Sequence, residues 1–259
     1  MTAVISGAGA AGPARSASAW RCRERLGLRS CEDGGGGPEG IGSDVWGSER
    51  PVGEWHGIET EADGRVVRLT IYDNNLDGKL SPAVCGLERL QTLHLSFNKI
   101  SGHLPDTLGD CRALKNLWLK GNRLTGRIPD TVAVLPALEY LDVHANRLSG
   151  SLPTEWDTPK LKILRAEDNK ISGALPAALF DQPSLEQVFL HDNKLTGALP
   201  SSLTEAANLH SLLLADNGLT GPIPEGIGRL QQLTDLRLNR NKLTGAIPES
   251  LRDARSLQV

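Results

Sequence analysis

The sequence lacks any apolar run that approaches the ~18 residues needed to cross a membrane, so no membrane span is predicted. Residues 1–30 also lack a basic leader followed by an apolar stretch, so no secretory signal is predicted and a cytoplasmic location is expected. The same residues are rich in Ala, Ser and Arg, which leaves an organelle transit peptide as an alternative.

Charge of one sign does not dominate either. The chain has 28 Lys and Arg against 31 Asp and Glu, which gives a formal net charge of -3. Because the two signs are mixed along the chain, the sequence predicts no basic stripe for nucleic acid or for an anionic membrane surface. Neither is therefore expected as a partner.

Cysteines and catalytic motifs are scarce. The four cysteines are Cys22, Cys31, Cys85 and Cys111, and they form neither a Cys-x-x-Cys pair nor a metal-ligand spacing, so reduced thiols are predicted. The motifs Gly-x-Ser-x-Gly and His-Glu-x-x-His, a kinase signature and a phosphate-binding Gly-x-x-x-x-Gly-Lys-Ser/Thr loop are all missing. We therefore predict a protein that is not an enzyme and that carries no cofactor.

What the chain does contain is a repeat, marked by a recurring asparagine. The interval is 24 residues, with one interval of 23. The marker residues, called the ladder asparagines below, are Asn74, Asn98, Asn122, Asn146, Asn169, Asn193, Asn217 and Asn241. A period of this length predicts a solenoid, because a single unit cannot bury its apolar face and must stack on its neighbours.

Each part of the repeat has a physical reason. Alternating leucines such as Leu117 and Leu119 point inward from a short strand, and stacked copies then form a parallel sheet. The asparagine amide can donate to and accept from backbone groups of adjacent turns that would otherwise be buried unpaired. Gly126 permits a tight bend, and Pro129 ends strand pairing before a more helical return segment.

The stretches "LTGRIP", "LSGSLP" and "ISGALP" that follow the asparagines resemble the plant-type leucine-rich repeat family. The resemblance implies an α/β repeat fold: a curved, right-handed solenoid of about eight 24-residue repeats with a parallel sheet on its concave face. In this family such solenoids serve as receptor ectodomains, as inhibitors of cell-wall hydrolases or as intracellular scaffolds.

Three segments are predicted. Residues 1–50 lack the period and form a disordered Gly-, Ala- and Arg-rich tail and linker. Residues 51–66 resemble the amino-terminal cap of this family, with Trp55 covering the open end of the core. No cysteines bracket that tryptophan, unlike in secreted members, which argues against an extracellular, disulfide-capped protein. Residues 67–259 form the solenoid, truncated in a ninth repeat.

The outward positions of the strands are the candidate binding surface. Only five Trp, two Tyr and three Phe occur in the chain, and half of them fall on these positions. Aromatic side chains beside Arg and His are typical of protein or peptide recognition, although aromatic residues also simply suit strands. The candidate partner-binding residues are Tyr72, His94, Trp118, Lys120, Tyr140, His144, Arg165, Phe189, His191 and Arg237.

One subset of these positions has metal-ligand chemistry. His144, Glu167 and His191 are equivalent residues of three successive repeats, and two imidazoles with a carboxylate are competent zinc ligands. A mixed polar surface that happens to alternate is the favoured explanation of the pattern, so no metal is predicted.

The function predicted from the sequence is a non-catalytic protein- or peptide-binding module with a scaffold or recognition role. One alternative is a ligand-binding ectodomain fragment of a membrane receptor-like protein or receptor kinase. Another is an assembly module that docks through its open carboxy-terminal end. The oligomeric state is not predicted.

Overall fold

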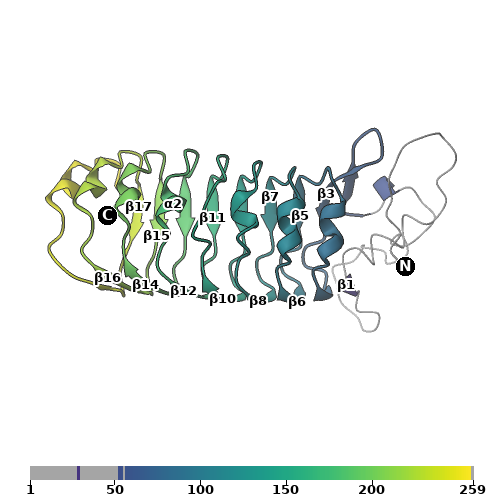
Figure 1. Cartoon of the computed structure of the whole chain (residues 1–259), viewed down its shortest axis with the longest axis horizontal. Coiled ribbons are helices and arrows are strands. Elements are labelled where there is room, and N and C mark those ends of the chain that lie inside the picture. Colours follow the sequence, from purple (N-terminus) through teal and green to yellow (C-terminus); the bar gives the residue numbers. More distant parts are fainter. Residues whose placement is uncertain (1–27, 30–51, 55, 258–259) are drawn as a thin grey trace.

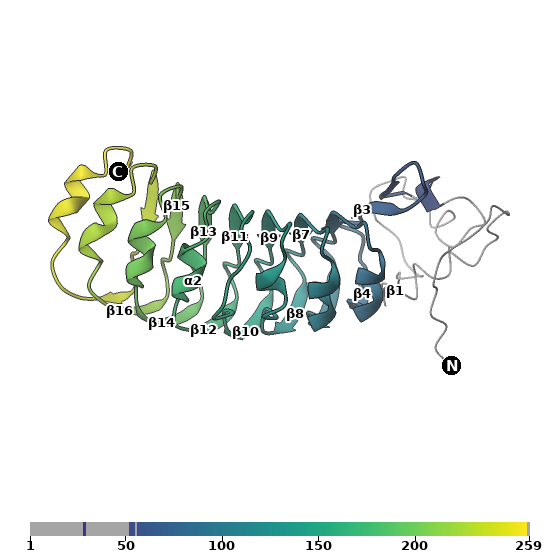
Figure 2. The same cartoon turned by 45° about the horizontal axis from the view of Figure 1, so that its top comes forward.

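The computed structural model describes residues 28–29, 52–54 and 56–257 of the chain. Trp55, Cys22, Cys31 and most of the expected tail of residues 1–50 lie outside this part. The described coils stack into an elongated array (Figure 1), which bends gently with the row of β7, β9, β11 and β13 on its inner side (Figure 2). The predicted solenoid fold is therefore confirmed.

The inner row is a nine-stranded sheet, here called the first sheet, and eight of its strands are parallel. Each strand pairs with the next in the register of one repeat, so that Leu93 lies opposite Leu69 and Leu117. The strand β2 pairs antiparallel with β3 at one edge. The strands are β2 (Ile58–Thr60), β3 (Val66–Thr70), β5 (Thr92–His94), β7 (Asn116–Trp118), β9 (Tyr140–Asp142), β11 (Ile163–Arg165), β13 (Gln187–Phe189), β15 (Ser211–Leu213) and β17 (Asp235–Arg237).

A second nine-stranded sheet, which the sequence did not predict, consists of eight strands formed by the residues after the ladder asparagines and of β1, which pairs antiparallel with β4 at one edge. Its register is shifted by two residues, so that Arg123 lies opposite Ser101 of the preceding repeat. The strands are β1 (Leu28–Arg29), β4 (Asp77–Lys79), β6 (Lys99–His103), β8 (Arg123–Gly126), β10 (Arg147–Ser151), β12 (Lys170–Gly173), β14 (Lys194–Ala198), β16 (Gly218–Gly221) and β18 (Lys242–Leu243).

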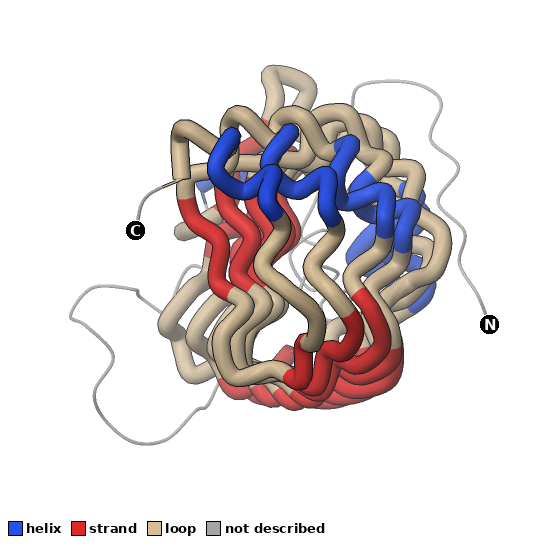
Figure 3. The backbone as a smooth tube through the Cα atoms, turned by 90° about the vertical axis from the view of Figure 1, so that its left-hand side faces the viewer, coloured by secondary structure: helices blue, strands red, loops and turns tan. Residues whose placement is uncertain are grey.

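Short helical turns form the third side of the array, as Figure 3 shows in the view along the stack. They begin at or shortly after the proline of every repeat but one, as expected. The segments are η2 (Pro82–Gly86), η3 (Asp106–Asp110), η4 (Val132–Val134), α2 (Ala177–Phe180), η5 (Ser201–Glu205), η6 (Glu225–Arg229) and η7 (Glu249–Asp253), and η1 (Val52–Glu54) precedes β2. Within the described residues, no helix is long and apolar enough to span a membrane.

The repeat that is one residue short has no helical turn on its return side. There the Trp156 side chain is buried in the core, and its Nε1 donates to Pro153 O at 2.9 Å. The Gln182 side chain from the next coil accepts from Thr158 N at 2.8 Å and donates to Trp156 O at 3.0 Å. These side-chain bonds replace the backbone bonds that a helical turn supplies elsewhere.

The ladder asparagines connect consecutive coils. Asn122 Nδ2 donates to Leu95 O at 2.9 Å and Leu119 O at 3.0 Å, while its Oδ1 accepts from Ile100 N at 3.0 Å. The same set of bonds recurs at the asparagines from Asn98 to Asn241. Backbone groups at the corner between the two sheets are thereby paired without water.

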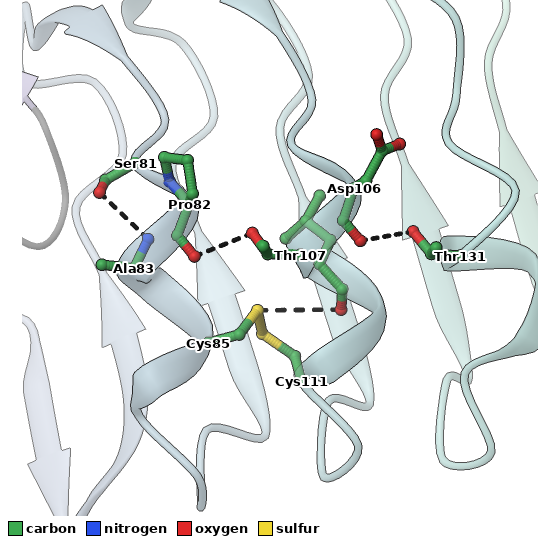
Figure 4. Close-up of a disulfide and its surroundings, with 9 residues drawn as sticks. Ser81, Pro82, Ala83, Cys85, Asp106, Thr107, Cys111 and Thr131 are labelled. Carbon is green, nitrogen blue, oxygen red and sulfur yellow. Dashed lines mark hydrogen bonds between the residues drawn. A yellow bond between two sulfur atoms is a disulfide. The ribbon is translucent and has the colours of Figure 1, made fainter. Parts of the chain in front are cut away.

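The return segments are joined by a disulfide between Cys85 and Cys111, with their Cα atoms 4.8 Å apart (Figure 4). The prediction of reduced thiols was therefore wrong for this pair. A separation of 26 residues is one repeat plus two, and it places the two cysteines side by side because η2 and η3 are neighbours. On the same side, threonine hydroxyls also bond to backbone carbonyls of the preceding coil. Thr107 Oγ1 donates to Pro82 O at 2.8 Å, and Thr131 Oγ1 donates to Asp106 O at 2.7 Å.

Candidate ligand-binding face of the first sheet

The register of the first sheet aligns its outward side chains in columns that run along the stack. Equivalent residues of neighbouring repeats are Cα partners, so their side chains are spaced by about 4.8 Å. The rim column is defined as the residues two positions before each ladder asparagine. Its members are Tyr72, Ser96, Lys120, His144, Glu167, His191, Ala215 and Asn239.

Three aromatic rings gather over the first coils. The Tyr72 and His94 rings stack at 5.0 Å, and the His94 and Trp118 rings meet edge to face at 4.9 Å. Tyr72 is 54% exposed, so this cluster presents a large apolar surface to solvent. Burial lowers the pKa of His94 below its ordinary value, the positive charge of Lys120 lowers it further, and Asp142 opposes both. Near neutral pH the ring is therefore an uncharged partner for aromatic or apolar groups.

Lys120 has a second role beside this cluster. Its Nζ lies 5.0 Å from the centroid of the Phe97 ring, which is a cation–π contact. Phe97 occupies the corner position, directly before the ladder asparagine, and its backbone is left-handed there. Phe97 and its equivalents Asp168 and Asp192 have φ angles of 52–55°. These corner residues leave the strand and turn the chain toward the second sheet.

A polar cluster occupies the middle of the face. His144 Nδ1 lies 2.6 Å from Asp142 Oδ1 and 3.6 Å from Glu167 Oε1. Arg165 donates to the same Glu167 oxygen through Nε at 2.9 Å and also through Nη2. The Arg165 guanidinium lies 5.0 Å from the centroid of the Phe189 ring. One carboxylate therefore holds an imidazole and a guanidinium in fixed positions.

Several outward positions are more buried than the sequence suggested. Ser96, Asp142, Glu167 and Thr92 are buried, although alternation places them on the open side of the strands. The close strand spacing and the inward bend crowd these side chains against their neighbours. The interpretation that outward positions are free of packing is therefore wrong for this part of the face.

The rim column contains most of the buried polar atoms that lack a partner. Among the described residues, four buried side-chain N or O atoms make no hydrogen bond: Ser96 Oγ, Glu167 Oε2, His191 Nδ1 and His210 Nδ1. The first three belong to the rim column, and only His210 does not. Buried polar groups are almost always hydrogen-bonded in folded proteins, so an unpaired set in one column requires an explanation.

The predicted binding residues fall into two groups and two outliers. Tyr72, His94, Trp118 and Lys120 form the aromatic group, and His144, Arg165, Phe189 and His191 line the polar middle. Tyr140 is half-buried between Asn116 and Ile163 and makes no ring contact within the described residues. Arg237 is exposed at the far end and pairs with Asp235 at 3.1 Å. Sequence reasoning passed over Ser96 and Asp142, although alignment by columns places both beside named candidates.

No metal centre emerges from His144, Glu167 and His191. In the part of the chain that the structure describes, no three His, Cys, Asp or Glu side chains are arranged to hold a metal ion. Instead, His144 Nδ1 contacts Asp142 and Glu167 Oε1 pairs with Arg165.

The comparison with known proteins agrees with this architecture. Two family models of leucine-rich repeats match the chain. One, described as "Leucine rich repeat", matches residues 88–148, and the other, described as "Leucine Rich Repeat", matches residues 208–230 and 232–254. A probable leucine-rich repeat receptor-like protein kinase of Arabidopsis thaliana is 44% identical over 57 residues, which cover 22% of this chain and 6% of the kinase.

Three solved structures share the fold. The plant peptide hormone receptor RGFR1, in complex with RGF2, has a TM-score of 0.72 and 35% identity, over 73% of this chain and 31% of that one. The ectodomain of the plant membrane receptor kinase GASSHO1/SCHENGEN3 from Arabidopsis thaliana, in complex with CASPARIAN STRIP INTEGRITY FACTOR 2, has a TM-score of 0.72 and 28% identity, over 93% and 32%. A plant ice-binding protein has a TM-score of 0.69 and 27% identity, over 83% and 77%. This chain thus spans about a third of the two receptor structures.

These findings contradict the expected cytoplasmic location. The receptor structures that the chain resembles are extracellular ectodomains of membrane proteins, which points to an extracellular location. The disulfide between Cys85 and Cys111 agrees, because such bonds persist in oxidising compartments. The cysteines on which the sequence argument relied were those around Trp55, whereas the observed bond lies on the return side of the array. The described solenoid has the leucine-rich repeat fold, and it is similar to the leucine-rich repeat regions of plant receptor kinases.

Proposed function

We propose that the concave face of the first sheet binds an extended peptide, either free or as a segment of a protein partner. The observation that carries this proposal is the aromatic group at one end of the face: Tyr72 is 54% exposed and stacks on His94, and His94 meets Trp118 edge to face. Aromatic side chains that are open to solvent on a concave surface are typical contact points for a bound peptide.

The distances suit a short extended segment. From β5 to β13 the rim column crosses four strand spacings, or about 19 Å, which about six extended residues span. Such a segment would begin over the aromatic cluster of Tyr72, His94 and Trp118 and would end beside Phe189. Large aromatic side chains carry most of the binding energy at protein interfaces, and the polar middle would set direction and register.

Relatives favour a receptor-type ligand site over a scaffold, since two of the similar structures are receptors bound to partners, one of them a peptide hormone receptor. The fold alone does not decide this, because the ice-binding protein shares it. The argument therefore depends on the residues of the concave face.

A displayed library of random linear peptides, selected against the full-length chain, tests the proposal. The selected peptides are then measured against Tyr72→Ala and Trp118→Ala and against a control, Val134→Ala, which removes a half-exposed apolar side chain from the return side. We expect each concave-face change to weaken binding about tenfold or more and the control to leave it unchanged. Selection of no peptide, or equal losses in all three variants, would refute concave-face binding.

A further inference from the structure

The second sheet carries a row of cations that composition alone concealed. The first residue of its strands is basic in six of the seven strands from β6 to β18, and Gly218 of β16 is the exception. The basic row consists of Lys99, Arg123, Arg147, Lys170, Lys194 and Lys242. The row follows the edge of the array along β6 to β16 in Figure 1. The expectation that no basic stripe exists was therefore wrong, because equivalent residues lie 24 apart in the sequence and adjacent in space.

These cations are available to a partner. All of them are exposed except Lys99, which is half-buried. Within the described part of the chain, none of the six takes part in an ion pair, although eleven other pairs or contacts of opposite charge occur there. Uncompensated charges of one sign in a line raise the local concentration of an oppositely charged chain.

The charge is strongest over β6, β8 and β10. There the neighbouring corner residues are Phe97, Gly121 and Ala145, which are uncharged, whereas Asp168, Asp192 and Asp216 border the later part of the row. Lys79 extends the positive surface on the other side, because its side chain lies against the Cα of Gly102. Arg127 is also basic but pairs with Asp130 at 3.2 Å.

Hydroxyl groups alternate with the cations. The two-residue shift in register places Arg123 opposite Ser101, Arg147 opposite Thr125 and Lys170 opposite Ser149. The strand spacing combined with this shift separates successive cations by about 8 Å along a diagonal. Glycines such as Gly126, with φ of 75°, follow each hydroxyl residue, and the His103 ring of the preceding repeat lies close to Gly126.

We propose that this surface binds a linear acidic polysaccharide, a polyuronate, laid along the basic row. Carboxylates of the polymer pair with the cations, and its hydroxyls bond to the Ser and Thr side chains between them. Single-stranded nucleic acid is disfavoured because its binding uses aromatic stacking platforms, and the outward residues of β6 to β18 include no Phe, Tyr or Trp. The extracellular location indicated by the related receptors favours a polysaccharide as the source of charge. The proposal does not depend on peptide binding by the concave face.

The test uses the full-length chain and oligogalacturonates of defined length, with binding measured by calorimetry at several salt concentrations. The fully methyl-esterified oligomer is the uncharged control ligand, and a single-stranded oligonucleotide and anionic lipid vesicles are competitors. The test variant changes three cations of the row: Arg123→Gln, Arg147→Gln and Lys170→Gln. The matched variant makes the same change in net charge on the return side: Arg229→Gln, Arg252→Gln and Arg255→Gln, all exposed.

We expect binding that weakens with salt, that is lost with the esterified oligomer, and that falls about tenfold in the test variant but less than about twofold in the matched variant. Absence of binding to the wild-type chain would overturn the proposal. So would equal losses in both variants, or tighter binding to the oligonucleotide or to the vesicles.

Discussion

Replacing a ladder asparagine in the middle of the array, Asn122→Ala, should destabilise the protein far more than Asn74→Ala at its start. Asn122 is buried, and its loss leaves Ile100 N, which it accepts from at 3.0 Å, without that partner. An unpaired buried donor costs about 1–3 kcal/mol. Leu95 O and Leu119 O each lose one of two asparagine donors, which adds about 0.5–1 kcal/mol each.

The expected loss for Asn122→Ala is therefore about 2–4 kcal/mol. Asn74 is matched in residue type and repeat position, yet among the described residues its side-chain amide makes a single bond, at 3.4 Å to Tyr72 O. We expect less than about 1 kcal/mol there. Urea unfolding of the full-length chain, followed by circular dichroism, measures both variants against the wild type. If Asn122→Ala costs no more than Asn74→Ala, the account of the ladder is refuted.

Three further changes probe other parts of the structure. Cys85→Ser should lower the free energy of unfolding by about 3–4 kcal/mol, because the disulfide no longer restricts a 26-residue loop in the unfolded chain. A reductant should cause the same loss in the wild type, and unfolding in urea measures both. Lys120→Gln should raise the pKa of His94, though not to 6.5 because burial remains, which a nuclear magnetic resonance titration measures. Since the folded ring binds fewer protons than the unfolded one, this histidine makes stability rise with pH between its lowered pKa and 6.5. Gly57→Ala should lower the free energy of unfolding by about 2 kcal/mol more than Gly64→Ala, as measured by thermal unfolding. Both glycines have φ near 80°, but only at Gly57 would the new Cβ lie 2.1 Å from a backbone oxygen. Equal effects of the two glycine changes, or a lowered His94 pKa in the lysine variant, would contradict these arguments.

The periodicity of the ladder asparagines was enough to predict the stacked coils and the first sheet, because one repeat in sequence is one step in space. The second sheet escaped prediction because its strands, such as Arg123–Gly126, are short and contain a glycine that weakens any strand pattern. The two-residue shift in its register is a property of the pairing between coils, which local sequence does not encode.

Details of the surface depended on contacts between repeats. The alternation of side chains along each strand predicted correctly that Glu167 and Ser96 point outward, but it did not predict that they are buried. Their burial arises from crowding on the inner side of the bend. The disulfide partners Cys85 and Cys111 are not separated by a whole repeat, so only the packing of η2 against η3 reveals them. The basic row was not predicted because its residues lie one or more repeats apart in the sequence and become neighbours only when the coils stack.

The most direct test of concave-face binding compares two histidines that share one property. His191 and His210 both have a buried Nδ1 without a hydrogen-bond partner, but only His191 belongs to the rim column. The affinity of a library-selected peptide for His191→Phe and His210→Phe, measured by calorimetry, therefore isolates the contribution of a histidine that lies on the concave face. We predict a loss of about tenfold or more for His191→Phe and an unchanged affinity for His210→Phe. Equal affinities in the two variants would contradict the claim that the rim column holds the ligand.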